Sequence, residues 1–187
     1  MSRCLIVYSG RGRLAAAVAT YLQEKGVPVV GAVDRSTANR AALESLGIPV
    51  FSLEPTAEEW AGLCLDQQVA LIALAGFLRP VPPDIVARYK GRIVNSHPAL
   101  LPAFGGKGMY GRHVHEAVVR EGAIESGFTV HEVTEAYDEG PVVYQLRLPI
   151  EGLSISEVEA FVQAVERELY PAIVWRLWVE RVERRVF

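Results

Sequence analysis

The sequence predicts an α/β protein that forms a single domain, with a mostly parallel central sheet and helices on both faces. The length of 187 residues is close to that of one ordinary domain. Half of the residues are hydrophobic and 22% are charged, which is enough apolar material for a full core. Roughly the first hundred residues alternate short β-branched runs with helical patterns, the order that produces a parallel sheet covered by helices.

The first half contains five short apolar runs that predict strands. They cover residues 4–8, 27–33, 49–53, 69–75 and 92–96. The segments between them predict helices at 14–25 and 38–46, each ended by a glycine, and a third helix that begins at Thr56. Thr56 and Glu59 have the spacing of a capping box, which marks the start of this third helix.

The second half has a different texture. Proline and glycine are frequent from residue 98 to 111, which predicts a loop that forms a lid or part of a site rather than a linker. A short helix and two strands are expected near 113–121, 128–133 and 142–149. A long amphipathic helix begins at Ser154 with a second capping box, and Pro171 is expected to kink or interrupt it.

Charge and composition exclude several classes of function. Nineteen basic and 22 acidic residues leave a net charge of -3, so the basic surface of a general nucleic-acid binder is missing. The longest apolar runs, such as 69–76, are far shorter than a membrane span, and no targeting segment is evident, so a cytoplasmic location is expected. Cys4 and Cys64 lie in apolar surroundings and are expected to be buried structural thiols.

A glycine-rich turn follows the first predicted strand. Gly10, Gly12 and Ala15 fit the Gly-x-Gly-x-x-Ala pattern, in which backbone N–H groups at a helix N-terminus hold a phosphate. Asp34 and Arg35 end the second strand, where a dinucleotide enzyme holds a ribose hydroxyl or a 2'-phosphate. The pattern therefore predicts a phosphate site, and it leaves open both a simple tight turn and an NADPH-linked oxidoreductase.

A second group of polar residues lies at the end of a central strand. Asn95 and His97 alternate along that strand and point to the same side, at the sheet edge where ligands bind. An amide donor and an imidazole at one point suit a reaction that builds negative charge on an oxygen. Asp138, in a predicted turn, would raise the pKa of this imidazole. The alternatives are a hydrogen-bonded strand-end histidine and a solvated loop carboxylate.

Other polar and aromatic residues are less informative. His113, His115 and His131 do not have the spacing of metal ligands, so no metal is expected. Glu166 lies among apolar residues of the last predicted helix, and periodicity alone does not decide between an exposed charge and a functional group. Trp175 and Trp178 are interpreted as core or interface residues.

Five segments carry a family resemblance. They are SGRG at 9–12, AGFLR at 75–79, NSHPALLP at 95–102, GFTVH at 127–131 and DEGPV at 138–142. Over residues 3–175 the chain resembles the folate-dependent formyltransferase superfamily and, within it, the phosphoribosylglycinamide formyltransferases. The Asn-x-His-Pro-x-Leu-Leu-Pro block, followed by Asp-x-Gly-Pro, is much more specific than the glycine-rich turn. The resemblance implies a Rossmann-like formyltransferase fold.

The resemblance also implies an activity and a set of site residues. Without a metal, 10-formyltetrahydrofolate would donate its formyl group to the amine of glycinamide ribonucleotide in purine synthesis. The implied catalytic residues are Asn95, His97 and Asp138. The implied substrate-binding residues are Gly10, Arg11, Gly12, Arg13, Gly76 and Glu166. The implied folate-binding residues are Leu78, Arg79, Pro80, Val81, Tyr137, Glu139 and Gly140. Residues 1–95 would form the phosphate-binding and substrate-binding half of the domain, and 96–187 the catalytic and folate-binding half.

One departure from the family pattern leaves the acceptor open. The family loop usually continues Gly-x-Gly-Ser-Asn, whereas this chain has Arg13 and Leu14. Arginine binds phosphate through two parallel hydrogen bonds, so the loop is expected to keep a phosphate by another contact. A different amine acceptor and a catalytically silent relative remain as alternatives. The partners expected are small molecules, with neither nucleic acid nor membrane, and a homodimer is one option for the oligomeric state.

Overall fold

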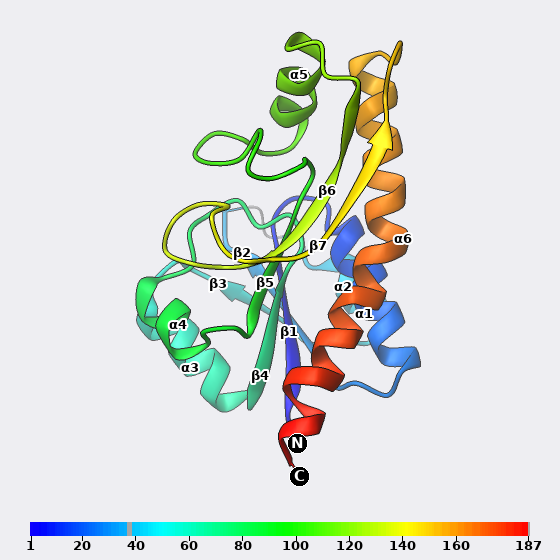
Figure 1. Ribbon diagram of the computed structural model, residues 1–187. Coiled ribbons are helices and arrows are strands. Elements are labelled where there is room, and N and C mark those ends of the chain that lie inside the picture. The colour runs from blue at the N-terminus through cyan, green and yellow to red at the C-terminus, as the bar shows by residue number, and fades with distance from the viewer. Residues whose placement is uncertain (37–38, 187) are drawn as a thin grey trace.

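A seven-stranded sheet forms the centre of the protein, as a computed structural model that describes residues 1–36 and 39–186 shows (Figure 1). The strand order is β3-β2-β1-β4-β5-β6-β7. The first five strands are parallel, and β6 and β7 extend the sheet as antiparallel neighbours. The predicted fold class is confirmed, because a mostly parallel sheet carries helices on both faces.

The strands agree closely with the predicted runs. Their bounds are β1 Arg3–Tyr8, β2 Val29–Asp34, β3 Val50–Leu53, β4 Val69–Leu74, β5 Ile93–His97, β6 Glu125–Glu132 and β7 Val142–Pro149. The boundary expected between residues 95 and 96 falls inside β5, so the two halves of the domain share one sheet.

The helices are α1 Arg13–Glu24, α2 Ala41–Glu44, α3 Ala57–Asp66, α4 Pro83–Arg88, α5 Arg112–Arg120 and α6 Ile155–Arg181, followed by the 3-10 helix η1 Glu183–Val186. Helix α4 was not predicted, because its single apolar turn is too short to show periodicity. Helix α2 is shorter than the predicted 38–46, and the start of that range lies outside the described residues. Both predicted cap residues lie at helix starts, and Ser154 forms the full reciprocal capping box with Glu157. At Thr56 one half forms: Thr56 Oγ1 accepts a hydrogen bond from the Glu59 N–H at 3.3 Å, whereas the Glu59 carboxylate accepts from the Glu54 N–H at 3.0 Å.

The helices cover the sheet in two layers, with α1 and α6 on one face and α3 and α4 on the other (Figure 1). Alternate residues of β1 divide between these layers. Cys4, Ile6 and Tyr8 pack with α1 and α6, whereas Leu5 and Val7 pack with α3 and α4. All five side chains are fully buried, so the core continues through both faces of the sheet.

Helix α6 continues through Pro171, so the expectation of an interruption there is wrong. Proline inside a helix costs about 3 kcal/mol, because it removes a hydrogen bond and crowds the preceding turn. The face around it offsets this cost. Tyr170 and Val174 are fully buried against the sheet, and the Tyr170 hydroxyl donates to the Leu74 carbonyl at 2.9 Å.

The remaining expectations concern thiols, tryptophans and membranes. Cys4 and Cys64 are buried free thiols, as predicted. Trp178 lies in the core, and Trp175 packs edge-on against Tyr21. Within the described ranges, no helix combines the length and the apolar character needed to cross a bilayer.

Candidate active site

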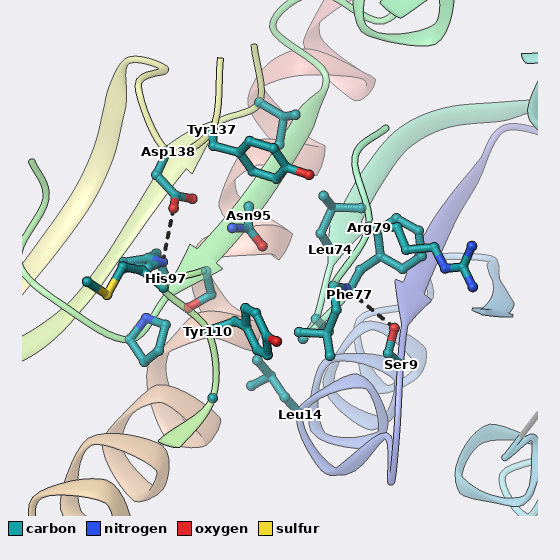
Figure 2. Close-up of a pocket in the computed structure, with 18 of the residues that line it drawn as sticks. Ser9, Leu14, Leu74, Phe77, Arg79, Asn95, His97, Tyr110, Tyr137 and Asp138 are labelled. Atoms are coloured by element: carbon teal, nitrogen blue, oxygen red, sulfur yellow. Dashed lines mark hydrogen bonds and ion pairs between the residues drawn. The ribbon is translucent and has the colours of Figure 1, made fainter. Parts of the chain in front are cut away.

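A cavity of about 700 Å³ opens at the carboxyl ends of β1, β4 and β5. Parallel strands all end at the same edge of a sheet, so the loops that follow Tyr8, Leu74 and His97 meet there. The Pro- and Gly-rich loop before α5 and the turn between β6 and β7 complete the wall. Figure 2 shows side chains from these segments around one space.

The structure brings together the three residues implied to be catalytic. Asn95 and His97 come from β5, and all three side chains line the cavity (Figure 2). The Nδ1 atom of His97 lies 3.5 Å from Oδ2 of Asp138. Asp138 adopts a left-handed backbone conformation, with φ of 57°, and its side chain lies against the imidazoles of His97 and His131. The turn is therefore part of the site rather than a solvated loop.

His131 joins this group, although the sequence reasoning considered it only as a metal ligand. It lies opposite Asn95 in the β5–β6 pairing, and its Nε2 atom lies 3.2 Å from Nδ2 of Asn95. The same Nε2 atom lies 3.4 Å from Oδ1 of Asp138, while Nδ1 donates to the Glu132 carbonyl at 2.9 Å. Asp138 thus bridges two imidazoles. The signal available in the sequence was the GFTVH segment, which contributed only to the resemblance.

Protonation in this cluster follows burial as well as charge. Burial, together with the nearby His131, lowers the pKa of His97 by more than Asp138 and the Phe104 carbonyl raise it, so its pKa lies below the ordinary value. Burial alone would raise the pKa of Asp138, but hydrogen bonds from His131 and Gly106 and the nearby His97 hold it below its usual range. Asp138 is therefore ionised at neutral pH. Asp138 therefore raises the pKa of His97, as predicted, but burial outweighs this contribution.

The loop after β5 contacts the cluster at two points. The Nε2–H of His97 donates to the Phe104 carbonyl at 2.8 Å, and the Gly106 N–H donates to Oδ2 of Asp138 at 2.9 Å. Since a carbonyl only accepts, Nε2 of His97 must carry a proton, and Nδ1 then faces a carboxylate. Both ring nitrogens thus have acceptors, so bringing a negative ligand oxygen into the cavity would favour the doubly protonated ring.

The glycine-rich turn lies at the N-terminus of α1. Gly12 has φ of 65°, and a Cβ there would lie 2.8 Å from the Tyr8 ring and 2.9 Å from Cβ of Ala42, so a larger residue does not fit. Arg11, Gly12 and Arg13 line the cavity, whereas Gly10 lies beside the lining. The turn therefore places a helix N-terminus and two arginine residues at the cavity wall.

Most, but not all, of the residues implied to bind folate line the cavity. The run 78–81 and Tyr137 line the cavity, as does Gly76, which was implied to bind the other substrate. Glu139 is exposed and lies outside the lining. Gly140 is also outside it, and a Cβ there would lie 1.7 Å from the Glu132 carbonyl oxygen, so this glycine permits a close backbone approach.

Asp34 and Arg35 are engaged within the fold. Oδ2 of Asp34 accepts a hydrogen bond from the Arg79 Nε–H at 2.7 Å. Arg35 forms ion pairs with Glu54 and Glu59 at 3.4 Å and 3.1 Å. The two side chains that would hold the ribose of a dinucleotide therefore stabilise neighbouring loops instead, which weakens the oxidoreductase alternative.

Glu166 is buried and lines the cavity, so it is not an exposed charge on the helix face. Its Oε1 atom accepts a hydrogen bond from the Ser96 hydroxyl at 2.6 Å. Burial raises the pKa of Glu166 to about 7, although Ser96 and Arg167 oppose the increase. A carboxyl group that titrates near neutral pH therefore faces the cavity.

Several lining residues were not given a site role from the sequence. Some belong to the loop before α5 or to one face of α6: Lys107, Met109, Tyr110, Glu159, Gln163 and Arg167. The others follow β1 and β4 or lie in α5: Ser9, Phe77 and His115. Of the three histidines considered as metal ligands, His113 is exposed, whereas His115 and His131 are buried. Across the described part of the chain, no group of three or more His, Cys, Asp or Glu side chains has the arrangement of a metal site.

Comparisons with known proteins find relatives over most of the chain. The profile of the formyl transferase family matches residues 2–174. A phosphoribosylglycinamide formyltransferase of Bacillus subtilis is 32% identical and is covered over 95% of both chains. The chloroplastic enzyme of Vigna unguiculata is 35% identical over 88% of this chain and 49% of its own length, so this chain spans about half of that relative. The crystal structure of phosphoribosylglycinamide formyltransferase from Bacillus halodurans superimposes with a TM-score of 0.82 at 32% identity, covering 94% of this chain and 95% of that one.

Proposed function

The chain belongs to the formyl transferase family, and we propose that it transfers the formyl group of 10-formyltetrahydrofolate to the amine of glycinamide ribonucleotide. The observation that carries the proposal is the meeting of Asn95, His97 and Asp138 in a cavity that also receives the N-terminus of α1. One end of the cavity thus offers hydrogen-bond donors for an oxyanion, and another offers a cationic helix end for a phosphate.

The reaction requires two bond changes and a proton transfer. The amine nitrogen attacks the formyl carbon and forms the new C–N bond, and the carbonyl electrons move to oxygen. Asn95 Nδ2–H and protonated His97 donate hydrogen bonds to this oxyanion. The negative charge on the oxygen in turn stabilises the doubly protonated, cationic form of the His97 ring. The bond from carbon to N10 then breaks. N10 takes up a proton and the former amine loses one, with Asp138 as the ionised group that carries the exchange through water.

The Phe104 carbonyl gives this mechanism a structural requirement. It accepts the His97 Nε2–H, which the oxyanion needs. The loop that contains Phe104 must therefore move aside, or the imidazole must turn, when the folate enters. Leu78 and Val81 line the part of the cavity that would receive the flat pterin ring.

Arg13 replaces the contacts that the family loop usually supplies. It is the first residue of α1, it is exposed, and it lines the cavity beside Gly12. Its guanidinium adds a paired hydrogen-bond donor to the backbone N–H groups of the helix start. We therefore expect the acceptor to carry a phosphate.

The test is an assay of the purified protein with 10-formyltetrahydrofolate and glycinamide ribonucleotide, with product identified by mass. Formylation of the ribonucleotide supports the proposal. Faster formylation of an unphosphorylated amine would replace the acceptor, and folate binding without turnover would indicate a silent relative. Tight NADPH binding with no folate binding would overturn the proposal. We also propose a cytoplasmic location, with a homodimer as one option, which fractionation and sedimentation measure.

A further inference from the structure

We infer that Ser96 is a positioning residue for the amine substrate, because its hydroxyl holds the Glu166 carboxylate in the orientation that faces the cavity. The inference rests on the proposed function, and it adds a residue to which neither the sequence nor the resemblance gave a role. Ser96 Oγ and Glu166 Oε1 are 2.6 Å apart, and the two side chains come from β5 and α6.

The strand alternation makes this contact possible. Asn95 and His97 point toward the catalytic side of β5, so Ser96 between them points to the opposite face, where α6 packs. Ser96 is 6% exposed and Glu166 is 8% exposed, so the hydrogen bond is shielded from water. A bond of this kind to an ionised group is stronger than one at the surface. Three consecutive residues of β5 therefore serve both parts of the site: Asn95 and His97 belong to the catalytic group, and Ser96 holds the Glu166 carboxylate.

The second oxygen of Glu166 is the one available to a ligand. An ionised carboxylate accepts about four hydrogen bonds, and in the described chain Ser96 is the one side chain that donates to this group. Since Glu166 lines the cavity, the missing donors would come from whatever fills it. Hydroxyl groups of a ribose are donors of this type. Ser96 therefore fixes one oxygen so that the other meets the sugar.

The surroundings of Glu166 make the contact dependent on pH. Arg167 and Tyr170 lie near it on α6, Cys4 of β1 lies near Tyr170, and Arg13 and His115 line the same cavity from α1 and α5. Burial raises the pKa of Glu166 to about 7, and the Ser96 hydroxyl acts against this by stabilising the ionised form. Loss of that hydroxyl raises the pKa further, so a larger fraction of Glu166 is protonated at neutral pH.

The experiment measures KM for glycinamide ribonucleotide, KM for the folate, and kcat in Ser96→Ala, Glu166→Gln and the double variant, across pH. Ser96→Ala is expected to raise KM for the ribonucleotide about tenfold at neutral pH, the effect of losing one hydrogen bond to a charged group, with a much smaller change in KM for the folate. The pH at which ribonucleotide binding is half lost on acidification should move upward. In the Glu166→Gln background, Ser96→Ala should have no further effect, because Ser96 acts through Glu166.

Ser126→Ala is the matched control. Ser126 lies in β6, is 1% exposed, has no hydrogen-bond partner for its hydroxyl within the described chain, and lies outside the cavity lining, so this variant makes the same change in the core without touching Glu166. Wild-type kinetics for Ser96→Ala, or fully additive effects in the double variant, would overturn the inference while leaving the formyltransferase intact. Absence of ribonucleotide formylation in the wild type would instead remove the proposed function and the inference with it.

Discussion

Glu166→Gln is predicted to change how the stability of the protein depends on pH. The folded-state pKa of Glu166 is about 7, against an ordinary value of 4.5, because the carboxyl group is buried. Since the folded-state pKa is raised, the protonated carboxyl contributes its full stability below about pH 4.5, and that contribution is lost as pH rises through 7. The glutamine side chain has nearly the same shape and stays uncharged, so the variant lacks this loss.

The magnitude follows from the difference of about 2.5 between 7 and 4.5. Each step of one in pKa corresponds to about 1.4 kcal/mol, so the full loss is about 3 kcal/mol. Between pH 5 and pH 8 most of this loss occurs, about 2–3 kcal/mol. The free energy of unfolding of the wild type should therefore fall, relative to that of Glu166→Gln, by this amount over the interval.

Urea denaturation of both proteins at a series of pH values measures the difference, and the titration of all other groups cancels in it. Glu168→Gln is the control, since Glu168 is exposed on the same helix and the substitution is identical. A wild-type and Glu166→Gln difference that stays constant from pH 5 to pH 8 would refute the reasoning, because it would mean that burial does not oppose the charge of Glu166.

Three predictions concern catalysis. Asn95→Ala should fold normally and lose about 100-fold to 1,000-fold in kcat, the typical cost of one oxyanion donor. Steady-state kinetics measure the loss, and circular dichroism checks the folding. Near-normal turnover would remove Asn95 from the mechanism. Asp138→Asn should move the alkaline limb of the pH–rate profile to lower pH, because the carboxylate raises the pKa of His97. The control Asp66→Asn, at an exposed helix end, should leave the profile unchanged. Superimposable profiles for Asp138→Asn and wild type would contradict this prediction. Arg13→Ala should raise KM for the ribonucleotide roughly tenfold or more, with a smaller change in kcat. Arg11→Ala removes the same charge earlier in the same turn and serves as the comparison. Unchanged ribonucleotide kinetics in both variants would exclude a phosphate contact of these arginines.

The agreement between predicted and observed elements has a local origin. The β-branched runs that became β1 to β5 and the helix caps at Thr56 and Ser154 are encoded by neighbouring residues, so periodicity and cap spacing were enough to find them. Pro171 and α4 show the limit of this approach. The cost of a proline is local, but burial of the face around Tyr170 depends on the sheet beneath it.

Some features of the site were likewise predictable from the sequence, and others depend on the tertiary structure. The alternation of Asn95 and His97 and the glycine spacing at the start of α1 are properties of the chain, so the sequence alone predicted a polar group and a phosphate loop. The juxtaposition of Asp138 with two histidines was decided by the antiparallel pairing of β5 with β6, which sets Asn95 opposite His131.

Burial decided the charge states, and burial is a property of the tertiary structure alone. The sequence indicated that Asp138 would raise the pKa of His97, but desolvation in the folded protein outweighs that effect. The same physical cause raises the pKa of Glu166 and allows one hydroxyl, that of Ser96, to matter. Sequence therefore determined which chemical groups are present and in what order. Only the tertiary packing, of α6 against Ser96 and of the loop after β5 against His97 and Asp138, determined how much water each group keeps, and hence which proton it holds.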